Sequence, residues 1–197
     1  MIIGAILTQS VSWKNVKIAI LNLKDQDLLQ PTKLHKIKTE KLASLIRSSR
    51  FYNQKANKIK TFLDFFFAEY DGDISIMSRE NPVILRRKLL MIKGLGEETV
   101  DSILLYACNK PIFVVDAYTK RIFSRWGLID EKATYSAIQD FFMENLPRDV
   151  EIYNDFHAQI VHLGHLVCKT TPNCNHCPIR IIDSNLKCQY FIKNQKH

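Results

Sequence analysis

Glycine and proline are scarce in this chain, with six of each among 197 residues, and it contains no low-complexity tract or repeat of fixed period. With 46% hydrophobic residues, this composition excludes a disordered protein and favours a globular, mostly helical one. No apolar run reaches the roughly 18–20 residues of a membrane-spanning helix, so we expect no membrane partner. The apolar start at residues 1–7 has no basic residue before it and is too short for a signal peptide. We therefore expect a cytoplasmic protein of a prokaryote-like cell.

Acidic residues are scarce in one segment of the chain. Residues 33–60 contain nine lysines and arginines but a single acid, Glu40, an excess that equals the net charge of +8 of the whole chain. This charge and an isoelectric point near 9.2 favour a polyanionic partner. Most of these basic side chains also have a simpler interpretation, as the solvated face of a helix.

Apolar residues recur at helical spacing along most of the chain. The predicted helices cover residues 13–22, 39–47, 55–69, 83–91, 97–108, 118–126, 135–145 and 152–167. Phe62, Phe65 and Phe66 share one face of the third of these helices, and we expect them to be core residues. The sequence thus predicts an all-α protein, with a crossing between domains close to Pro111.

The turn Lys93-Gly94-Leu95-Gly96 joins two of these predicted helices, and the second helix begins directly after it, at Glu97. Glycine allows a positive φ and a close approach of the backbone to a partner. The first N–H groups of the second helix point outward at the positive end of its dipole, which suits a phosphate oxygen. Glycines at turns are common, so this feature alone is weak evidence for phosphate binding.

Two polar residues end apolar stretches. Asp116 ends the apolar run at residues 112–115 and directly precedes a predicted helix, which suits an N-cap. Its carboxylate can also lie at the edge of a cleft and take part in chemistry.

Gln9 follows the apolar start of the chain, just before a break at residues 10–12. Two interpretations of Gln9 are open: an interaction with the end of its own helix, or a finger that enters a DNA duplex.

Four of the five cysteines lie near the C-terminus: Cys168, Cys174, Cys177 and Cys188. In a reducing compartment this clustering favours a metal site over disulfides. Four thiolates suit either a tetrahedral Zn²⁺ ion or a [4Fe–4S] cluster, and the spacing alone does not separate the two. We expect His176 to be a spacer in this loop and Cys108 to be a small core residue.

Five features occur in collinear order over nearly the whole chain: G-A-I-L-T-Q at residues 4–9, F-Y-N-Q-K-A at 51–56, K-G-L-G-E-E-T-V-D at 93–101, V-V-D-A-Y at 114–118 and the C-terminal cysteines. Together they resemble the endonuclease III superfamily of DNA glycosylases, which have a helix-hairpin-helix followed by a loop with an aspartate. The first two stretches are most similar to the endonuclease III-related branch that includes the 3-methyladenine DNA glycosylases.

This resemblance implies two helical domains that flank a DNA-binding cleft. Residues 1–111 would form a six-helix bundle ending in the helix-hairpin-helix, and residues 112–197 a helical domain with the cluster loop. Relatives have a further N-terminal helix, so we expect that a preceding segment is missing or that this protein manages without one. By position, Asp116 matches the essential aspartate, Gln9 matches the residue that fills the hole left by an extruded base, and the four cysteines match the ligands of a [4Fe–4S] cluster.

The resemblance also assigns residues that contact DNA. They are Gln9, Lys93, Gly94, Leu95, Gly96, Glu97 and Thr99. An aromatic pocket would favour a cationic base by cation–π contact, and the candidates are Trp13, Tyr52 and Tyr118, each of which is also readily explained as core.

The chain departs from the pattern of the family at two places. Two positions after Gly96, bifunctional relatives have a lysine whose amine forms a Schiff base with the sugar. Here that residue is Glu98, which cannot form an imine, so we predict base removal by water without efficient strand cleavage and expect Glu98 to favour a cationic base. The interval from Cys177 to Cys188 is longer than is usual in the family, and the loop can bulge there.

The resulting hypothesis is a monomeric base-excision glycosylase for double-stranded DNA, which hydrolyses the N-glycosidic bond of a flipped-out damaged base such as 3-methyladenine. Asp116 would stabilise the positive charge on the sugar and orient the attacking water. One alternative is a bifunctional glycosylase and AP lyase for oxidised pyrimidines. Others are a non-catalytic helix-hairpin-helix module that only binds DNA, and a zinc-stabilised helical protein with another partner.

Overall fold

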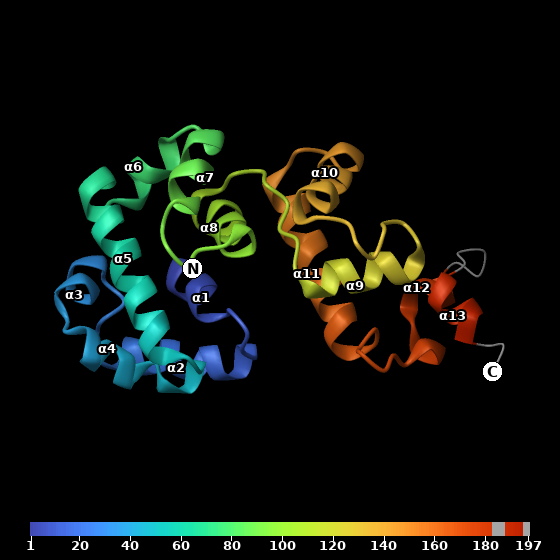
Figure 1. Ribbon diagram of the computed structural model, residues 1–197, viewed down its shortest axis with the longest axis horizontal. Coiled ribbons are helices and arrows are strands. Elements are labelled where there is room, and N and C mark those ends of the chain that lie inside the picture. Colours follow the sequence, from blue (N-terminus) through green and yellow to red (C-terminus); the bar gives the residue numbers. More distant parts are fainter. Residues whose placement is uncertain (183–187, 195–197) are drawn as a thin grey trace. The chain divides into compact units, whose positions relative to one another are not determined.

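The structure is a computed structural model that describes residues 1–182 and 188–194. Within these residues all regular structure is helical and no strand occurs, which confirms the all-α prediction. The chain forms two compact units, Met1–Lys110 and Pro111–His197, which are the blue-to-green and yellow-to-red parts of Figure 1. No helix in the described ranges is long and apolar enough to cross a membrane.

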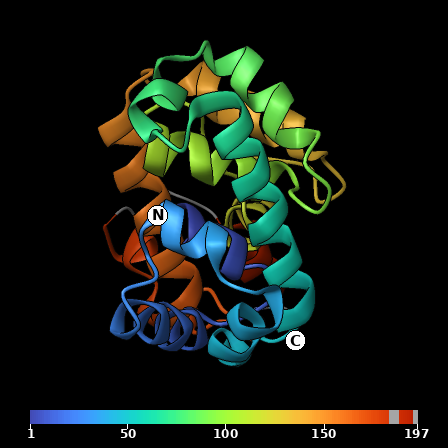
Figure 2. The same ribbon diagram turned by 90° about the vertical axis from the view of Figure 1, so that its left-hand side faces the viewer.

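The first unit contains eight α-helices and a short 3-10 helix. They are α1 (Ile2–Leu7), α2 (Trp13–Asp25), α3 (Pro31–Lys36), α4 (Thr39–Leu45), η1 (Arg47–Ser49), α5 (Tyr52–Tyr70), α6 (Ile74–Arg79), α7 (Pro82–Leu90) and α8 (Glu97–Cys108). Helix α5 is the longest, and Figures 1 and 2 show it running along the unit, in contact with α1, α3, α4 and α6. Helix α8 packs against α1, α6 and α7, so the two helices of the hairpin are anchored in the core of this unit.

The predicted core face of α5 is largely confirmed. Phe62 and Phe66 are only 2% and 3% exposed, and their rings stack with centroids 5.6 Å apart. Phe65 is half-buried and meets Tyr70 edge-on. Cys108 at the end of α8 is also buried, as expected of a small core residue.

Two six-residue helices, α3 and α6, lie outside the predicted helices. Pro31 is the first residue of α3, where a missing N–H costs nothing and the fixed φ of proline suits a helix. Asp73 caps α6, because its carboxylate accepts a hydrogen bond from the N–H of Ser75 at 2.7 Å. Helices of fewer than two turns show too little periodicity to be detected in a sequence. Both short helices therefore add to the helices that periodicity predicts for the first unit.

Helix α5 begins three residues earlier than predicted, directly after a left-handed bend. Arg50 and Phe51 have φ values of +53° and +43°, and the side chain of Phe51 is exposed. Each non-glycine residue in such a conformation costs on the order of 1–3 kcal/mol, which the surrounding contacts must offset. Tyr52 follows as the first residue of the helix.

The second unit contains α9 (Ala117–Trp126), α10 (Tyr135–Asn145), α11 (Val150–Leu166), η2 (Cys174–His176), α12 (Pro178–Ile182) and α13 (Gln189–Asn194). Helix α9 packs against α11 and α13. The core of this unit is aromatic: the Phe113 ring stacks on Phe142 with centroids 4.1 Å apart and meets Tyr153 edge-on at 5.5 Å. Gly127 closes α9 with a φ of +75°, as predicted.

Candidate functional site

The turn between α7 and α8 uses its two glycines differently. Gly94 has a φ of +94°, whereas Gly96 is extended, with φ −93° and ψ 175°, and is the N-cap of α8. The expectation of a left-handed backbone therefore applies to Gly94 alone. A Cβ atom added to Gly96 would meet no heavy atom within 4 Å, so the space at the N-terminus of α8 is open. This open space beside the positive end of a helix dipole suits an anionic ligand.

An ion pair between the two hairpin helices holds them together. Arg86 of α7 donates hydrogen bonds to both carboxylate oxygens of Asp101 on α8, at 2.7 and 3.0 Å, and Asp101 is fully buried. The guanidinium of Arg86 also lies 3.4 Å from Glu97. The predicted DNA contact Glu97 thus has a structural partner as well.

The other predicted hairpin contacts differ in exposure. Lys93 and Glu98 are exposed, whereas the side chains of Leu95 and Thr99 are buried. The N–H of Leu95 donates to the carbonyl of Ile92 at 3.1 Å. Leu95 therefore supports the turn from the core, and a ligand at this turn would meet its backbone rather than its side chain.

Gln9 is held against the hairpin by three hydrogen bonds. Its Nε2 donates to the carbonyl of Gly94 at 3.2 Å and to Oγ1 of Thr99 at 2.9 Å. Its Oε1 accepts a hydrogen bond from Nζ of Lys58 on α5. Of the two interpretations open for Gln9, the simple interaction with the end of its own helix is thus not the one observed. The tip of the first helical segment is joined to the hairpin turn.

Lys55, in the basic segment 33–60, is not a free surface charge. Lys55 is only 2% exposed, and its ammonium donates to the carbonyls of Leu7 (2.8 Å) and Ser49 (2.5 Å). Burial, with smaller contributions from Lys58 and Arg50, lowers the pKa of Lys55 to about 8. The interpretation of this segment as a solvated helix face therefore fails for Lys55.

In the second unit, Asp116 is the N-cap of α9. Its Oδ1 accepts hydrogen bonds from the N–H and the hydroxyl of Thr119, at 2.7 and 2.8 Å. Its Oδ2 lies 3.6 Å from Nε2 of His157 on α11, and both side chains are about nine-tenths buried, at 12% and 13% exposed. Burial by itself raises the pKa of Asp116, but the hydrogen bonding and charge of His157, together with Thr119, outweigh it and lower the pKa below its usual value.

The three aromatic pocket candidates lie in different surroundings. Trp13 begins α2 and is 62% exposed, while Tyr52 begins α5 and lies under the guanidinium of Arg47, at 5.8 Å. Tyr118 belongs to the second unit, where its ring lies against Gly164 so closely that a Cβ there would be 2.3 Å from it. Tyr118 therefore has a packing role, whereas the surface of Trp13 remains accessible.

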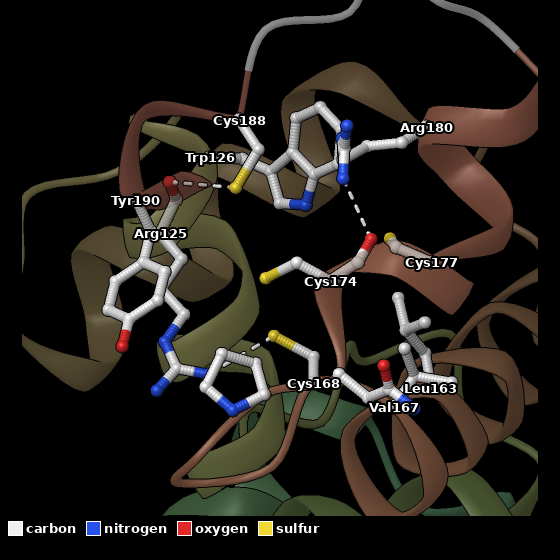
Figure 3. Close-up of a pocket in the computed structure, with 12 residues that line it drawn as sticks. Arg125, Trp126, Leu163, Val167, Cys168, Cys174, Cys177, Arg180, Cys188 and Tyr190 are labelled. Atoms are coloured by element: carbon white, nitrogen blue, oxygen red, sulfur yellow. Dashed lines mark hydrogen bonds between the residues drawn. The ribbon is translucent and has the colours of Figure 1, made fainter. Parts of the chain in front are cut away.

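The four C-terminal cysteines all line one pocket, together with Arg125, Arg180 and neighbouring apolar residues (Figure 3). Burial and the proximity of the other three cysteines raise the pKa of Cys174. Residues 183–187, in the interval where the loop can bulge, lie outside the part of the chain that the structure describes. Within residues 1–182 and 188–194, no three ligand-type side chains converge as they would around a single metal ion. The donor set itself, four thiols from one loop region, fits a metal or cluster.

Arginines of α9 tie this pocket to the helix that Asp116 caps. Arg125 donates to Sγ of Cys168 at 3.3 Å and to the carbonyls of Lys169 and Thr170. Arg121 donates to the carbonyls of Cys168 and Gly164, at 2.9 and 3.0 Å. The charge of Arg125, beside the sulfur of Cys168, is suitably placed to balance a set of thiolates.

Comparison with known proteins establishes the family. Residues 3–148 match the family model described as HhH-GPD superfamily base excision DNA repair protein. The chain belongs to this superfamily. MJ1434 of Methanocaldococcus jannaschii, provisionally named as a DNA repair glycosylase, is 49% identical to it over 181 residues, which cover 91% of this chain and 82% of the relative.

Solved structures agree with this assignment. The H. pylori 3-methyladenine DNA glycosylase MagIII, bound to 1,N6-ethenoadenine, shares 30% identity with a TM-score of 0.74 over 82% of each chain. An endonuclease III in a non-covalent complex with DNA has a TM-score of 0.82 at 21% identity, covering 100% of this chain and 85% of that chain, and so has the same fold. The resemblance inferred from the sequence is confirmed, and these findings support a base-excision DNA glycosylase of the HhH-GPD superfamily.

Two residues that contact predicted site residues, one in each unit, were not predicted from the sequence. Lys58 appeared only as one basic residue among nine, and His157 as one residue of a predicted helix. Each acquires its role through a contact with a residue far away in the chain, Gln9 and Asp116 respectively. A histidine or lysine on a predicted helix shows no local pattern that could reveal such a partner.

Proposed function

We propose that this protein is a monofunctional DNA glycosylase, acting as a monomer on double-stranded DNA that contains a damaged base. The proposal rests mainly on one observation: Asp116 is a largely buried carboxylate whose pKa is lowered by His157 and Thr119. A carboxylate that stays ionised in a low-dielectric site can stabilise a developing positive charge far better than one in water.

In this mechanism the target nucleotide leaves the base stack, at a cost of a few kcal/mol. The bond between the sugar C1′ and the base nitrogen then breaks, and its electron pair leaves with the base. Asp116 stabilises the positive charge on the sugar and orients the water whose oxygen bonds to C1′. The displaced proton passes to Asp116 or to solvent.

The hairpin and Gln9 hold the DNA in this proposal. The open space at Gly96 and the first N–H groups of α8 would receive a phosphate of the backbone, and the exposed Lys93 would add a positive charge. Gln9, joined to the same turn, would fill the hole left by the extruded base.

A cationic alkylated purine such as 3-methyladenine is the proposed substrate. Such a base already carries positive charge and leaves without a general acid, which agrees with a site whose assigned catalytic groups are carboxylates, Asp116 and Glu98. The similarity to an enzyme described as a 3-methyladenine DNA glycosylase supports this choice. Trp13 and Tyr52 are the aromatic candidates for cation–π contact with the base.

A [4Fe–4S] cluster held by Cys168, Cys174, Cys177 and Cys188 is the proposed cofactor, with Zn²⁺ as the alternative. The choice of the cluster over Zn²⁺ rests on the positions of the four cysteines, which match the cluster ligands of the superfamily, and all four line one pocket. When bound, the group would stabilise the loop that Arg121 and Arg125 connect to α9.

The decisive experiment is to incubate the protein with duplexes that each contain one damaged base, and to identify released bases by mass spectrometry. We expect release of alkylated purines. Release of oxidised pyrimidines with strand cleavage would favour the bifunctional alternative, and no release from any duplex would favour a module that only binds DNA.

Asp116→Asn tests the assigned catalytic role. Asparagine is as good an N-cap as aspartate, so the fold should persist while base release falls about a hundredfold or more and DNA binding stays unchanged. The matched control is Asp149→Asn, because Asp149 caps α11 in the same unit and accepts from Ile152 at 2.9 Å. Base release by Asp116→Asn at the rate of the control would refute the proposed role.

Borohydride trapping on a lesion duplex tests the absence of a lyase step. Glu98 cannot form an imine, and Nζ of Lys120, on α9, donates to the carbonyl of Ala133 at 3.1 Å. We therefore expect no covalent adduct between protein and DNA. A trapped adduct would show that one of the lysines acts as a nucleophile.

A further inference from the structure

We propose that Lys58 is a positioning residue for Gln9, and that it sets the orientation in which the Gln9 amide is presented beside the hairpin turn. The inference rests on the proposed function, because it is the role of Gln9 in the DNA that gives this orientation a consequence. Lys58 lies on α5, outside the hairpin and outside the first helical segment, and it contacts both.

The hydrogen bonds of Gln9 permit only one orientation of its amide. Both acceptors of its Nε2, the Gly94 carbonyl and the Thr99 hydroxyl, lie on the hairpin, and the only donor to its Oε1 among the described contacts is the Lys58 ammonium. If the amide were flipped, its NH₂ group would face an ammonium and its oxygen would face a carbonyl. Both contacts are repulsive, so Lys58 and Gly94 together select the observed orientation.

Lys58 is itself fixed by the turn. A Cβ atom built on Gly94 would lie 2.7 Å from Cε, 3.0 Å from Cγ and 3.1 Å from Cδ of Lys58. The lysine stem therefore occupies the space beside Gly94 that only a glycine leaves open. Because this stem packs against the turn, the ammonium reaches Gln9 from a fixed direction instead of moving as a free surface charge.

This arrangement links the residue that would fill the DNA gap to the turn that would hold the DNA phosphate. Gln9 meets the hairpin at Gly94 and Thr99, and Lys58 contacts both Gln9 and the turn. With the amide fixed, the position of Gln9 relative to the phosphate-binding turn is set before DNA binds. Less conformational freedom is then lost when the damaged nucleotide leaves the base stack, which lowers the entropic cost of that step. Without Lys58, the Oε1 of Gln9 loses its donor, and only the two hydrogen bonds from Nε2 to the hairpin hold the amide.

Lys58→Met keeps the length of the stem and removes the charge, and Lys24→Met, at an exposed position on α2, is the control for loss of one positive charge. The first measurement uses the free protein and NMR of the Gln9 side-chain amide, assigned by its absence in Gln9→Ala. We expect slow hydrogen exchange of this amide in the wild type and in Lys24→Met, and faster exchange with a shifted resonance in Lys58→Met. An unchanged Gln9 amide in Lys58→Met would overturn the proposal.

The second measurement is a double-mutant cycle with Gln9→Ala, using single-turnover base release and DNA affinity. We expect Lys58→Met to slow release about tenfold with little change in affinity, and to have no further effect in the Gln9→Ala background. Equal slowing in both backgrounds would contradict the proposal. Weaker binding with a smaller salt dependence in both backgrounds would contradict it too, since it would make Lys58 a phosphate contact. If the wild type releases no base, the proposed function fails, and the amide exchange still decides the contact between Lys58 and Gln9.

Discussion

Lys55 in the first unit and Asp116 in the second are buried charges of opposite sign, and they are stabilised in opposite ways. In the first unit, the ammonium of Lys55 is satisfied by the carbonyls of Leu7 and Ser49. In the second unit, the carboxylate of Asp116 is satisfied by the N–H and hydroxyl of Thr119, with His157 close by. Cations thus meet the negative ends of backbone dipoles, and the anion meets the positive end of a helix.

The difference follows from what each unit is proposed to do. The first unit would position a polyanion, so its lysines serve to fix the elements around the hairpin. The second unit would stabilise positive charge on a sugar, so it keeps a carboxylate ionised away from water. Arg125 of α9 extends this pattern, because its guanidinium lies beside the sulfur of Cys168 and would balance thiolate charge.

The largest expected effect comes from removing thiolates in the second unit. With the proposed [4Fe–4S] cluster bound, Cys168→Ser or Cys174→Ser should abolish the brown colour and the bound iron and sulfide of protein purified without oxygen, because serine does not replace a thiolate ligand. Cys108→Ala removes a buried cysteine of the first unit and should keep both colour and iron. Bound zinc in place of iron would contradict the cluster and favour the alternative.

The buried ammonium of the first unit should make stability depend on pH. The pKa of Lys55 is about 8 in the folded chain against 10.5 when unfolded, so between these values the unfolded state holds more protons and stability rises with pH. Between pH 7.5 and 9.5 the contribution of this lysine to the free energy of unfolding should rise by about 2 kcal/mol.

Urea unfolding of the wild type and of Lys55→Met measures this difference, because other titrating groups cancel between the two. Lys41→Met, which changes an exposed lysine, is the control and should show the pH dependence of the wild type. If the difference in the free energy of unfolding between the wild type and Lys55→Met did not change with pH, the ammonium would not be held as described.

Alanine substitutions at the two hairpin glycines should affect different properties, stability at one position and DNA binding at the other. Gly94→Ala places a Cβ atom at φ +94° against Lys58 and should lower the free energy of unfolding by about 1–2 kcal/mol. Gly96→Ala meets open space at an ordinary φ, so its stability should change by less than about 0.5 kcal/mol while DNA affinity falls. Thermal unfolding and a DNA-binding titration of both variants test this, and equal stability losses would be evidence against the described turn.

The smallest effect is expected from replacing His157, which contacts the Asp116 carboxylate. His157→Gln should slow base release about fivefold, roughly 1 kcal/mol, because a contact of 3.6 Å is a weak charged interaction. The loss of His157 should also raise the pKa of Asp116. The pH below which base release slows should therefore be higher in this variant than in the wild type. His162→Gln, on the exposed face of the same helix, should leave the pH profile unchanged.

Local features of the chain predicted the helices that are long enough to show their period, such as α8 and α10, and the capping position of Asp116. They could not predict α3 and α6, because six residues contain too little periodicity, nor the bend at Arg50 and Phe51, because neither residue type favours a positive φ.

Features that depend on neighbouring residues could be predicted without a structure: the glycine turn, the helix that follows it, the acid at the end of an apolar run, the cysteine spacing and the family to which these belong. The partners of the buried and half-buried charges became visible only in the folded chain. Lys58, Lys55 and His157 meet Gln9, Leu7 and Asp116 through packing of separate helices. Such contacts depend on how burial brings distant side chains together, and no local pattern of residue types specifies that.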